Sequence, residues 1–351
     1  MCMRQISSIA DDFPQQLDEL LAWDMSTSSD VDVVVAEIIA EVRTRGDEAL
    51  LAYTKKFDRV SAASVSEFEI SHDRLAAAWA KIDSSAQQAL EVAASRIRQF
   101  HEKQVEASWS FTDDLGNQLG QRISPIERVG VYVPGGRAAY PSSVLMTLVP
   151  AKVAGVDEVV VTVPTPDGVV NDMVLAALHL AGADQVFTIG GAQAVAAMAY
   201  GTQTIQKVDK IVGPGSAFVA AAKKQVFGQV GIDMIAGPSE VLVIADGTTS
   251  VEWAVLDLFS QAEHDSSAQS ILISPDANFI KAVTDKIDAM LPSMQRSEII
   301  AASLASRGAL IHCADAQDAI AIANRIAPEH LELAVADPEE WAKGIRHAGA
   351  I

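Results

Sequence analysis

The run Val129-Gly130-Val131-Tyr132-Val133-Pro134-Gly135-Gly136 decides the fold class of this chain. It joins a short apolar stretch, typical of a buried strand, to a glycine turn, and a helix pattern follows from about Ser142. The same order recurs at Gly190-Gly191-Ala192-Gln193 and at Gly213-Pro214-Gly215-Ser216. Repeated strands, glycine turns and helices predict an α/β protein in which helices cover a parallel sheet.

These glycine turns also bear on function, because ligands of such sheets bind beyond the carboxyl ends of the strands. Glycine lets the backbone approach a ligand, and the N-terminus of the following helix favours phosphate groups. A fourth turn, Ala236-Gly237-Pro238-Ser239, follows the expected strand residues Met234-Ile235. Each glycine alone is equally consistent with a tight turn, but four in one region favour a binding site. None is the Gly-x-Gly-x-x-Gly fingerprint, so an ordinary dinucleotide fold is not indicated.

Composition narrows the class of protein. With 351 residues the chain is long enough for two domains, and 49% hydrophobic residues exclude a disordered protein. A formal net charge of -20 argues against nucleic acids and anionic membranes as partners. Cys2 and Cys313 form neither a disulfide framework nor a cysteine-type zinc site. No signal peptide or membrane span is visible, so we expect a soluble, cytoplasmic protein.

A second stretch, Ser260-Gln261-Ala262-Glu263-His264-Asp265, closes a helix pattern that begins at Val251. Gln261 and His264 are three residues apart, so on a helix both side chains can reach one point. An amide oxygen and an imidazole at one point are suited to bind zinc. The alternative is a histidine that only faces the negative end of the helix dipole. Two ligands also fall short of the three that a catalytic zinc needs.

A third stretch, Ala327-Pro328-Glu329-His330-Leu331-Glu332-Leu333, follows a helix pattern that Pro328 ends. We therefore expect Glu329 and His330 in a turn or at its edge. A carboxylate beside an imidazole suits an acid–base pair, and the alternative is a solvated pair of loop residues. Residues 1 to about 120 are expected to be mainly helical, and we assign them no chemistry.

Six motifs, in order along the chain, resemble the histidinol dehydrogenase family. They are residues 129–136, Gly190-Gly191-Ala192-Gln193-Ala194, Gly213-Pro214-Gly215, Ala236-Gly237-Pro238-Ser239-Glu240, Gln261-Ala262-Glu263-His264-Asp265 and Ala327-Pro328-Glu329-His330-Leu331-Glu332. The likeness is dense from about Arg122 and looser before it, where residues 46–50 and 53–58 also fit. A single motif is weak, but six in family order are specific.

The resemblance implies a zinc enzyme that oxidises L-histidinol to L-histidine in two steps, using two NAD+. Gln261 and His264 match the family's first two zinc ligands. Substrate-contacting positions are matched by Ser239, Gln261, His264 and His330, and NAD-contacting positions by Tyr132 and Gln193. Ser216 stands where the family usually has an asparagine that contacts NAD.

The resemblance also assigns the acid–base roles. His330 matches the general base that takes the alcohol proton as hydride leaves. Glu329 matches the group that activates water to hydrate the bound aldehyde. The second hydride transfer then gives the acid.

The family fold implies two α/β domains that resemble incomplete Rossmann units with parallel sheets, preceded by a helical N-terminal region. We expect an N-terminal helical arm over residues 1–28 and a discontinuous first domain over 29–128 plus 241–351. The second domain, residues 129–240, would be inserted on the NAD side.

The family's chain continues past Ile351, where it carries an aspartate zinc ligand and a histidine lent by the partner of a domain-swapped homodimer. We therefore expect a truncated histidinol dehydrogenase that binds zinc poorly and is nearly inactive. Two alternatives stay open: a related zinc- and NAD-dependent dehydrogenase of another small amino or sulfo alcohol, and a naturally short, non-catalytic binding protein.

Overall fold

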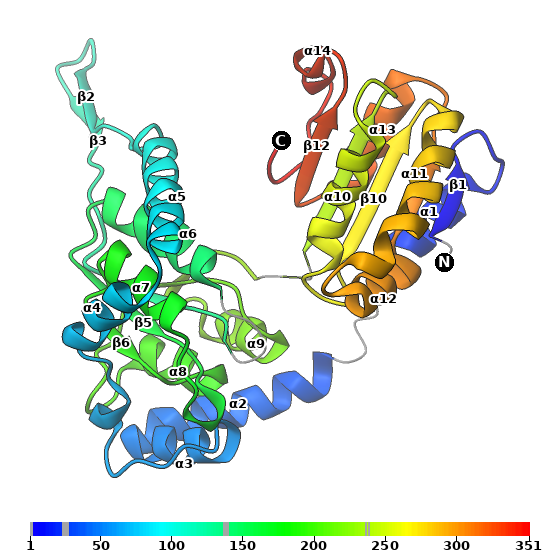
Figure 1. Ribbon diagram of the computed structural model, residues 1–351. Coiled ribbons are helices and arrows are strands. Elements are labelled where there is room, and N and C mark those ends of the chain that lie inside the picture. Colours follow the sequence, from blue (N-terminus) through cyan, green and yellow to red (C-terminus); the bar gives the residue numbers. More distant parts are fainter. Residues whose placement is uncertain (1–2, 23–27, 136–139, 236, 238) are drawn as a thin grey trace. The chain divides into compact units, whose positions relative to one another are not determined.

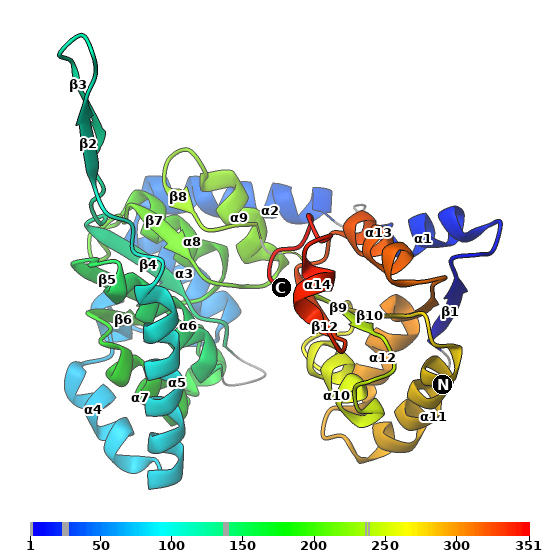
Figure 2. The ribbon, with the colours of Figure 1, turned by 90° about the horizontal axis from the view of Figure 1, so that it is seen from above.

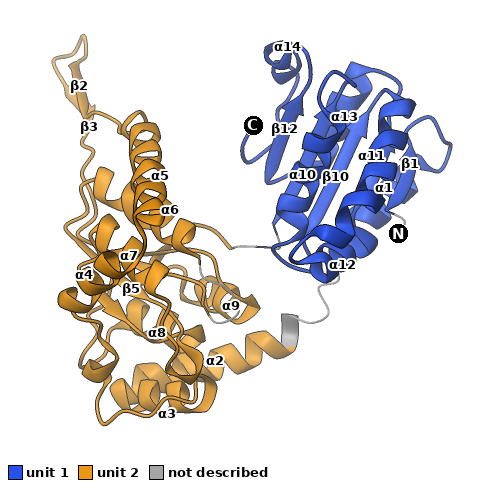
Figure 3. Cartoon of the chain, in the orientation of Figure 1, with its two compact units in different colours: residues 1–25, 237–351 blue, residues 26–236 orange. Residues whose placement is uncertain are grey.

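The computed structural model describes residues 3–22, 28–135, 140–235, 237 and 239–351. The chain divides into two compact units: unit 1 comprises residues 1–25 and 237–351, and unit 2 comprises residues 26–236 (Figure 3). Each unit contains a five-stranded parallel sheet, so the α/β class predicted from the glycine turns is confirmed. Residues 136, 236 and 238 of the predicted turns lie outside the described residues.

The sheet of unit 2 has the strand order β6-β5-β4-β7-β8. Its strands are β4 (Arg128–Tyr132), β5 (Glu158–Thr162), β6 (Gln185–Phe187), β7 (Lys210–Val212) and β8 (Gly231–Ile232). Val131 of β4 pairs with Val161 of β5 on one side and with Val212 of β7 on the other. β8 ends at Ile232, so the strand expected at Met234-Ile235 is instead exposed loop.

Helices cover both faces of this sheet in two layers (Figures 1 and 2). One side carries α8 (Gly191–Tyr200) and α9 (Ala217–Val226), with α2 (Ser28–Arg45) and α3 (Asp47–Phe57) packed on them. The other carries α6 (Pro141–Val153) and α7 (Asp172–Ala181), with α4 (His72–Lys81) and α5 (Ser84–Glu102) packed on them. A hairpin of β2 (Trp109–Thr112) and β3 (Gln118–Gln121) extends from the unit.

The structure groups residues 29–128 differently from the domain boundaries expected above. They pack on the sheet of residues 128–232, within unit 2. The physical reason is a shared apolar core, in which Val35 and Ile38 of α2 and Leu50 of α3 are buried with Val195 of α8. On the opposite face Leu75 of α4 is buried in the same way against the sheet's valines.

The sheet of unit 1 has the order β1-β11-β10-β9-β12. Its strands are β1 (Arg4–Ser7), β9 (Glu240–Ala245), β10 (Gln269–Ser274), β11 (Ala309–His312) and β12 (His330–Ala334). One face packs against α10 (Val251–Ala262), α11 (Ala277–Met290) and α12 (Ser297–Arg307), and the other against α1 (Phe13–Leu21) and α13 (Ala316–Ile326). Before its end the chain forms the short α14 (Pro338–Ala342) and pairs Ala350 with His330 in a parallel bridge.

The N-terminal segment is more than the expected helical arm. β1 is an edge strand of the unit 1 sheet, and Ile6 pairs with Ile311 of β11. Ile6 and Leu17 of α1 are buried in the core that α13 also covers. Over the described residues, no helix is both long and apolar enough to cross a membrane.

Candidate functional site

The three predicted cofactor-binding residues, Tyr132, Gln193 and Ser216, line a single cavity of about 440 Å³ in unit 2. Tyr132 ends β4, Gln193 lies in the first turn of α8 after β6, and Ser216 precedes α9 after β7. The cavity therefore lies beyond the carboxyl ends of the strands. β5 and β6 lie on one side of β4 and β7 on the other, so the chain switches direction here, where open α/β sheets bind ligands.

The glycine turns serve both packing and the cavity. Gly135, Gly190 and Gly191 line the cavity wall. A Cβ on Gly190 would come within 2.3 Å of Cβ of Pro164, so this position has no room for a side chain. Gly213 has a φ of 109°, which side chains disfavour, and a Cβ there would meet the Tyr132 carbonyl oxygen at 2.2 Å. These glycines are therefore needed for tight turns, and the turns also lie at the cavity.

Side chains already occupy the first amides of α8. The Gly191 amide donates to the Tyr132 hydroxyl at 3.1 Å, and the Gly190 amide donates to the Asp58 carboxylate. Burial raises the pKa of Tyr132 to about 12, with a smaller contribution from the Asp58 charge. Burial also raises the pKa of Asp58, against the opposing effects of Arg59 and the Gly190 amide.

Sequence reasoning missed one wall of this cavity. Val34 and Ile38 of α2, and Lys56, Phe57 and Asp58 at the end of α3, line it. They come from the helical region to which we assigned no chemistry. The available signal was the looser family likeness over residues 53–58, which does not by itself say that Asp58 is buried.

The predicted metal ligands lie at the end of α10, in unit 1. The helix ends at Ala262, so Gln261 is in its last turn and His264 is in the turn that follows. Gln261 is 8% exposed and its side-chain Nε2 has no hydrogen-bond partner in the described ranges, whereas His264 is exposed. The His264 amide donates to the Gln261 carbonyl at 3.2 Å, which fixes the turn. No group of three or more His, Cys, Asp or Glu suited to a metal occurs among the described residues.

The predicted acid–base pair is anchored to the backbone of Glu240. The Glu240 amide donates to Oε2 of Glu329 at 3.3 Å. Nδ1 of His330 lies 3.2 Å from the Glu240 carbonyl oxygen, which can only accept, so Nδ1 carries the proton. In the neutral ring Nε2 is then unprotonated, and half of the side chain is exposed. Oε2 of Glu329 lies 3.8 Å from Nδ1 of His330.

All five predicted residues of unit 1 lie at one edge of its sheet, the edge where the strands begin. His330 opens β12, Ser239 directly precedes β9, and Gln261 and His264 precede β10. The Ser239 carbonyl accepts from the Gln269 amide at 3.1 Å, which ties the start of β9 to the start of β10.

A carboxyl pair connects β12 to α10 behind this edge. Glu332 makes a side-chain hydrogen bond with Asp257, one turn before Gln261 in α10. Strand alternation places Glu332 and His330 on the same face of the sheet. The pKa of Glu332 is raised to about 7, mainly by burial and next by the charge of Asp257, while His330 acts to lower it.

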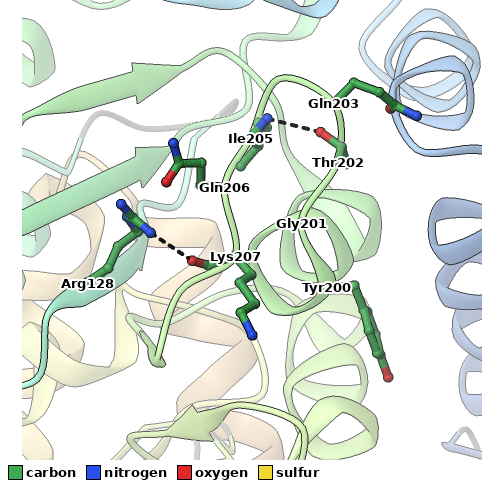
Figure 4. Close-up of a pocket in the computed structure, with 8 residues that line it drawn as sticks. All are labelled: Arg128, Tyr200, Gly201, Thr202, Gln203, Ile205, Gln206 and Lys207. Atoms are coloured by element: carbon green, nitrogen blue, oxygen red, sulfur yellow. Dashed lines mark hydrogen bonds between the residues drawn. The ribbon is translucent and has the colours of Figure 1, made fainter.

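Another hollow of unit 2, about 530 Å³ and open to solvent, contains none of the predicted residues (Figure 4). It lies beside Arg128, at the start of β4, and is formed mainly by the loop of residues 200–207. Its polar groups bind one another: Arg128 donates to the Lys207 carbonyl at 3.4 Å, and the Ile205 amide to Oγ1 of Thr202 at 3.0 Å. Arg128 also pairs with Glu158. We assign this hollow no function.

Known proteins resemble the chain along nearly its whole length. The histidinol dehydrogenase family model matches residues 22–351. Histidinol dehydrogenases of Pseudomonas aeruginosa and Chromobacterium violaceum are 57% and 56% identical over 99% of this chain, which spans 79% and 80% of their lengths. The crystal structure of histidinol dehydrogenase from Elizabethkingia anophelis superposes with a TM-score of 0.92 at 34% identity, over 99% of this chain and 79% of that one. The chain therefore belongs to the histidinol dehydrogenase family.

Proposed function

We propose that this protein oxidises L-histidinol through L-histidinaldehyde to L-histidine, a step of histidine biosynthesis, with His330 and Glu329 as its acid–base groups. The family is one of NAD-dependent oxidoreductases that use Zn²⁺. The observation that carries the assignment of roles is the anchoring of His330. Its Nδ1 is held by the Glu240 carbonyl, which leaves Nε2 as an exposed base beside a carboxylate.

The first step removes a proton and a hydride from the alcohol. Nε2 of His330 takes the hydroxyl proton, and the carbon-bound hydrogen leaves with its electron pair to the nicotinamide of NAD+. A C=O bond forms and gives the aldehyde. A fixed imidazole tautomer supports this role, because the base is already oriented and its hydrogen bond to Glu240 stabilises the protonated ring.

The second step needs water. Glu329, held by the Glu240 amide, accepts a proton from a water molecule that adds to the aldehyde carbon. The protonated His330 returns its proton to the aldehyde oxygen as the water adds, so the hydrate forms beside a neutral imidazole. The hydrate then loses a hydroxyl proton to His330 and a second hydride to another NAD+, which yields the carboxylic acid. Two NADH are therefore formed for each histidinol.

Gln261 and His264 fit the zinc site that the family implies. Gln261 is buried at the end of α10, and its amide oxygen is the atom that can bind zinc, whereas the Nε2 atom is a hydrogen-bond donor. The exposed His264 imidazole lies three residues further on. Both lie at the C-terminal end of α10, where the helix dipole favours a cation. When bound, zinc would position the substrate's nitrogen atoms and polarise its hydroxyl group. A catalytic zinc needs at least three protein ligands, and in this proposal the described residues supply two of them.

The cavity of unit 2 would hold NAD. Tyr132, Gln193 and Ser216 line it together, at the switch point of a parallel sheet. Ser216 is the N-cap residue of α9, and its side chain makes no capping hydrogen bond, so its hydroxyl can bind the cofactor. Ser239, beside the acid–base pair, would contact the substrate.

We further propose that the protein is a cytoplasmic homodimer. The hairpin of β2 and β3 supports self-association, because Trp109 and Phe111 are more than half exposed and stack with ring centroids 6.2 Å apart. Exposed aromatic pairs of this kind are enriched at protein interfaces. Light scattering of the chain after size exclusion measures its mass, and a monomer at all concentrations would contradict the dimer.

The function is tested with the chain, Zn²⁺, NAD+ and L-histidinol, by counting the NADH formed per histidinol consumed. The incubation is long and the zinc concentration is high, because two protein donors predict weak zinc binding and slow turnover. We expect two NADH for the wild type. Glu329→Gln should release the aldehyde and approach one, because hydration fails while the first hydride transfer remains. Glu339→Gln, an exposed carboxamide substitution on α14, is the control and should stay at two. NADH formed from another small alcohol but not from histidinol would overturn the substrate assignment.

A further inference from the structure

Asp58 is a buried carboxylate with unsatisfied hydrogen-bonding capacity at the NAD cavity. It is 6% exposed and lines the cavity at the end of α3. The Gly190 amide donates to one side of the carboxylate, while Oδ2 is buried and has no partner among the described residues. The neighbouring Arg59 does not supply a donor to Oδ2, because its guanidinium binds both oxygens of the exposed Asp167 at 2.5 Å. A buried carboxylate oxygen in this state favours a ligand that donates a hydrogen bond.

Gln193 presents a second acceptor in the same cavity. The residue is 1% exposed, and within the described part of the chain its Oε1 has no hydrogen-bond partner. Gln193 lies in the first turn of α8, and Asp58 accepts from Gly190 directly before that helix. The two unpartnered acceptors therefore border the same end of the cavity. Two neighbouring hydroxyl groups, as on a ribose ring, would satisfy both.

This end of the cavity disfavours phosphate. The first amides of α8, which would otherwise attract an anion, donate to Asp58 and to the Tyr132 hydroxyl. A phosphate placed here would meet the buried Asp58 charge in a medium that screens poorly. Lys56 is the cation that lines the cavity among the described residues, and its Nζ lies 5.2 Å from the Phe57 ring centroid. The cofactor's diphosphate would thus lie nearer Lys56 and Ser216 than Asp58.

The remaining wall is apolar and suits a flat base. Val34, Phe57 and Phe218 line it and are each more than 40% exposed, so a bound ring would cover them. The reacting groups Glu329 and His330 belong to unit 1, whereas the described residues that line this cavity all belong to unit 2. The part of the cofactor held here is therefore the part that does not react, which is the adenosine.

We propose that Asp58 and Gln193 accept hydrogen bonds from the 2′- and 3′-hydroxyls of the adenosine ribose, and that Asp58 thereby selects NAD over NADP. The inference rests on the proposed NAD-dependent function and adds the residue that sets cofactor choice. A 2′-phosphate removes one donor and places negative charge beside the carboxylate. Both effects act against NADP.

Calorimetric titration of the chain with NADH and NADPH tests this without requiring turnover. The wild type should bind NADH more tightly, and ADP-ribose should compete with NADH. Asp58→Asn keeps the shape of the side chain and removes its charge. We expect it to weaken NADH binding about tenfold, the effect of one charge-assisted hydrogen bond, and to shrink the NADH-to-NADPH affinity ratio by at least that factor.

Asp73→Asn is the matched control. This residue of unit 2 is exposed in the first turn of α4 and lies outside the cavity lining. Both dissociation constants should match the wild type. If Asp58→Asn keeps the wild-type affinity ratio, the selection role is overturned while the NAD-dependent function stands. If Asp58→Asn does not fold, wild-type affinities decide: equal binding of NADH and NADPH, or no competition by ADP-ribose, overturns the proposal. A wild type that binds neither dinucleotide overturns it too, and that result places the failure in the proposed function.

Discussion

The two sheets of this molecule carry their candidate residues at opposite ends of their strands. In unit 2, Tyr132, Gln193 and Ser216 follow the carboxyl ends of β4, β6 and β7. In unit 1, Glu329 and His330 lie where β12 begins, and Gln261 lies in the last turn of the helix that leads into β10. The general rule for ligand sites in parallel sheets therefore locates the proposed cofactor cavity of unit 2 but not the proposed acid–base groups of unit 1.

The helix dipoles explain why the two ends suit different ligands. At the carboxyl ends of strands in unit 2, α8 and α9 begin, and helix N-termini favour anionic groups such as a diphosphate. At the opposite edge in unit 1, α10 ends, and a helix C-terminus favours a cation. A protein that binds both a dinucleotide and a metal ion can therefore use the carboxyl ends of the strands in one sheet for the dinucleotide. It can use the opposite ends of the strands in the other sheet for the metal ion.

The largest effect is expected from replacing His330, which tests whether the proposed proton transfer in unit 1 is separate from the proposed NAD binding in unit 2. His330→Asn keeps a donor for the Glu240 carbonyl but removes the base, so kcat for histidinol oxidation should fall by about 10²- to 10⁴-fold. His347→Asn replaces an exposed histidine of the same unit and should leave kcat unchanged. Steady-state NADH formation measures both. A similar loss in the two variants would show that the role assigned to His330 is wrong.

A second substitution tests whether unit 2 depends on its glycine turn. In Gly190→Ala the new Cβ would meet Pro164, with its Cβ 2.3 Å and its Cα 3.0 Å away, and neither can move freely. We expect overpacking to lower the free energy of unfolding by about 1–3 kcal/mol, and NADH binding to weaken because Gly190 lines the cavity. Urea unfolding and calorimetry check the two effects. Unchanged stability would mean that the turn relaxes without cost.

The smallest effect concerns the carboxyl pair behind the unit 1 edge. Because the pKa of Glu332 is about 7 in the folded chain and 4.5 in the unfolded chain, its stabilising contribution is present below pH 4.5 and is lost as the pH rises through 7. Glu332→Gln can still donate to Asp257 and does not titrate. The free energy of unfolding of the variant, relative to that of the wild type, should therefore rise between pH 5 and pH 8. We expect a rise of about 1 kcal/mol, a value reduced because Glu332 is partly exposed.

Urea unfolding at both pH values measures this difference. Glu339→Gln on the exposed face of α14 serves as the control and should show no pH-dependent gain. If the free energies of unfolding of the wild type and of Glu332→Gln change with pH in parallel, Glu332 does not hold the extra proton that its raised pKa implies.

The sequence predicted the parts of this account that depend on local pattern. Apolar runs that end in glycine predicted the parallel strands of unit 2, and Pro328 correctly marked the end of a helix at Ile326. That the side chains of Gln261 and His264 reach one point stays a prediction, because the helix that was expected to carry both ends between them at Ala262. What local pattern could not show is which distant faces pack together. Residues 29–128 were expected with the unit 1 sheet, yet their apolar faces complement α8 and α7 of unit 2.

The same limit explains why Asp58 was not foreseen. An aspartate at the end of a helix is usually exposed, and the amide that binds Asp58 belongs to Gly190, which is more than a hundred residues away. Likewise, the tautomer of His330 follows from the Glu240 carbonyl on the neighbouring strand. Long-range partners of this kind depend on the order of the strands in the sheet, and that order cannot be read from the sequence alone.

The most direct test of the division between the two edges is NADH binding by the His330→Asn variant, measured by calorimetry. If the unit 2 cavity holds the cofactor and the unit 1 edge performs the proton transfers, the dissociation constant for NADH equals that of the wild type while histidinol oxidation is lost. An NADH dissociation constant that rises in step with the loss of activity would contradict the account, because His330 would then belong to the cofactor site.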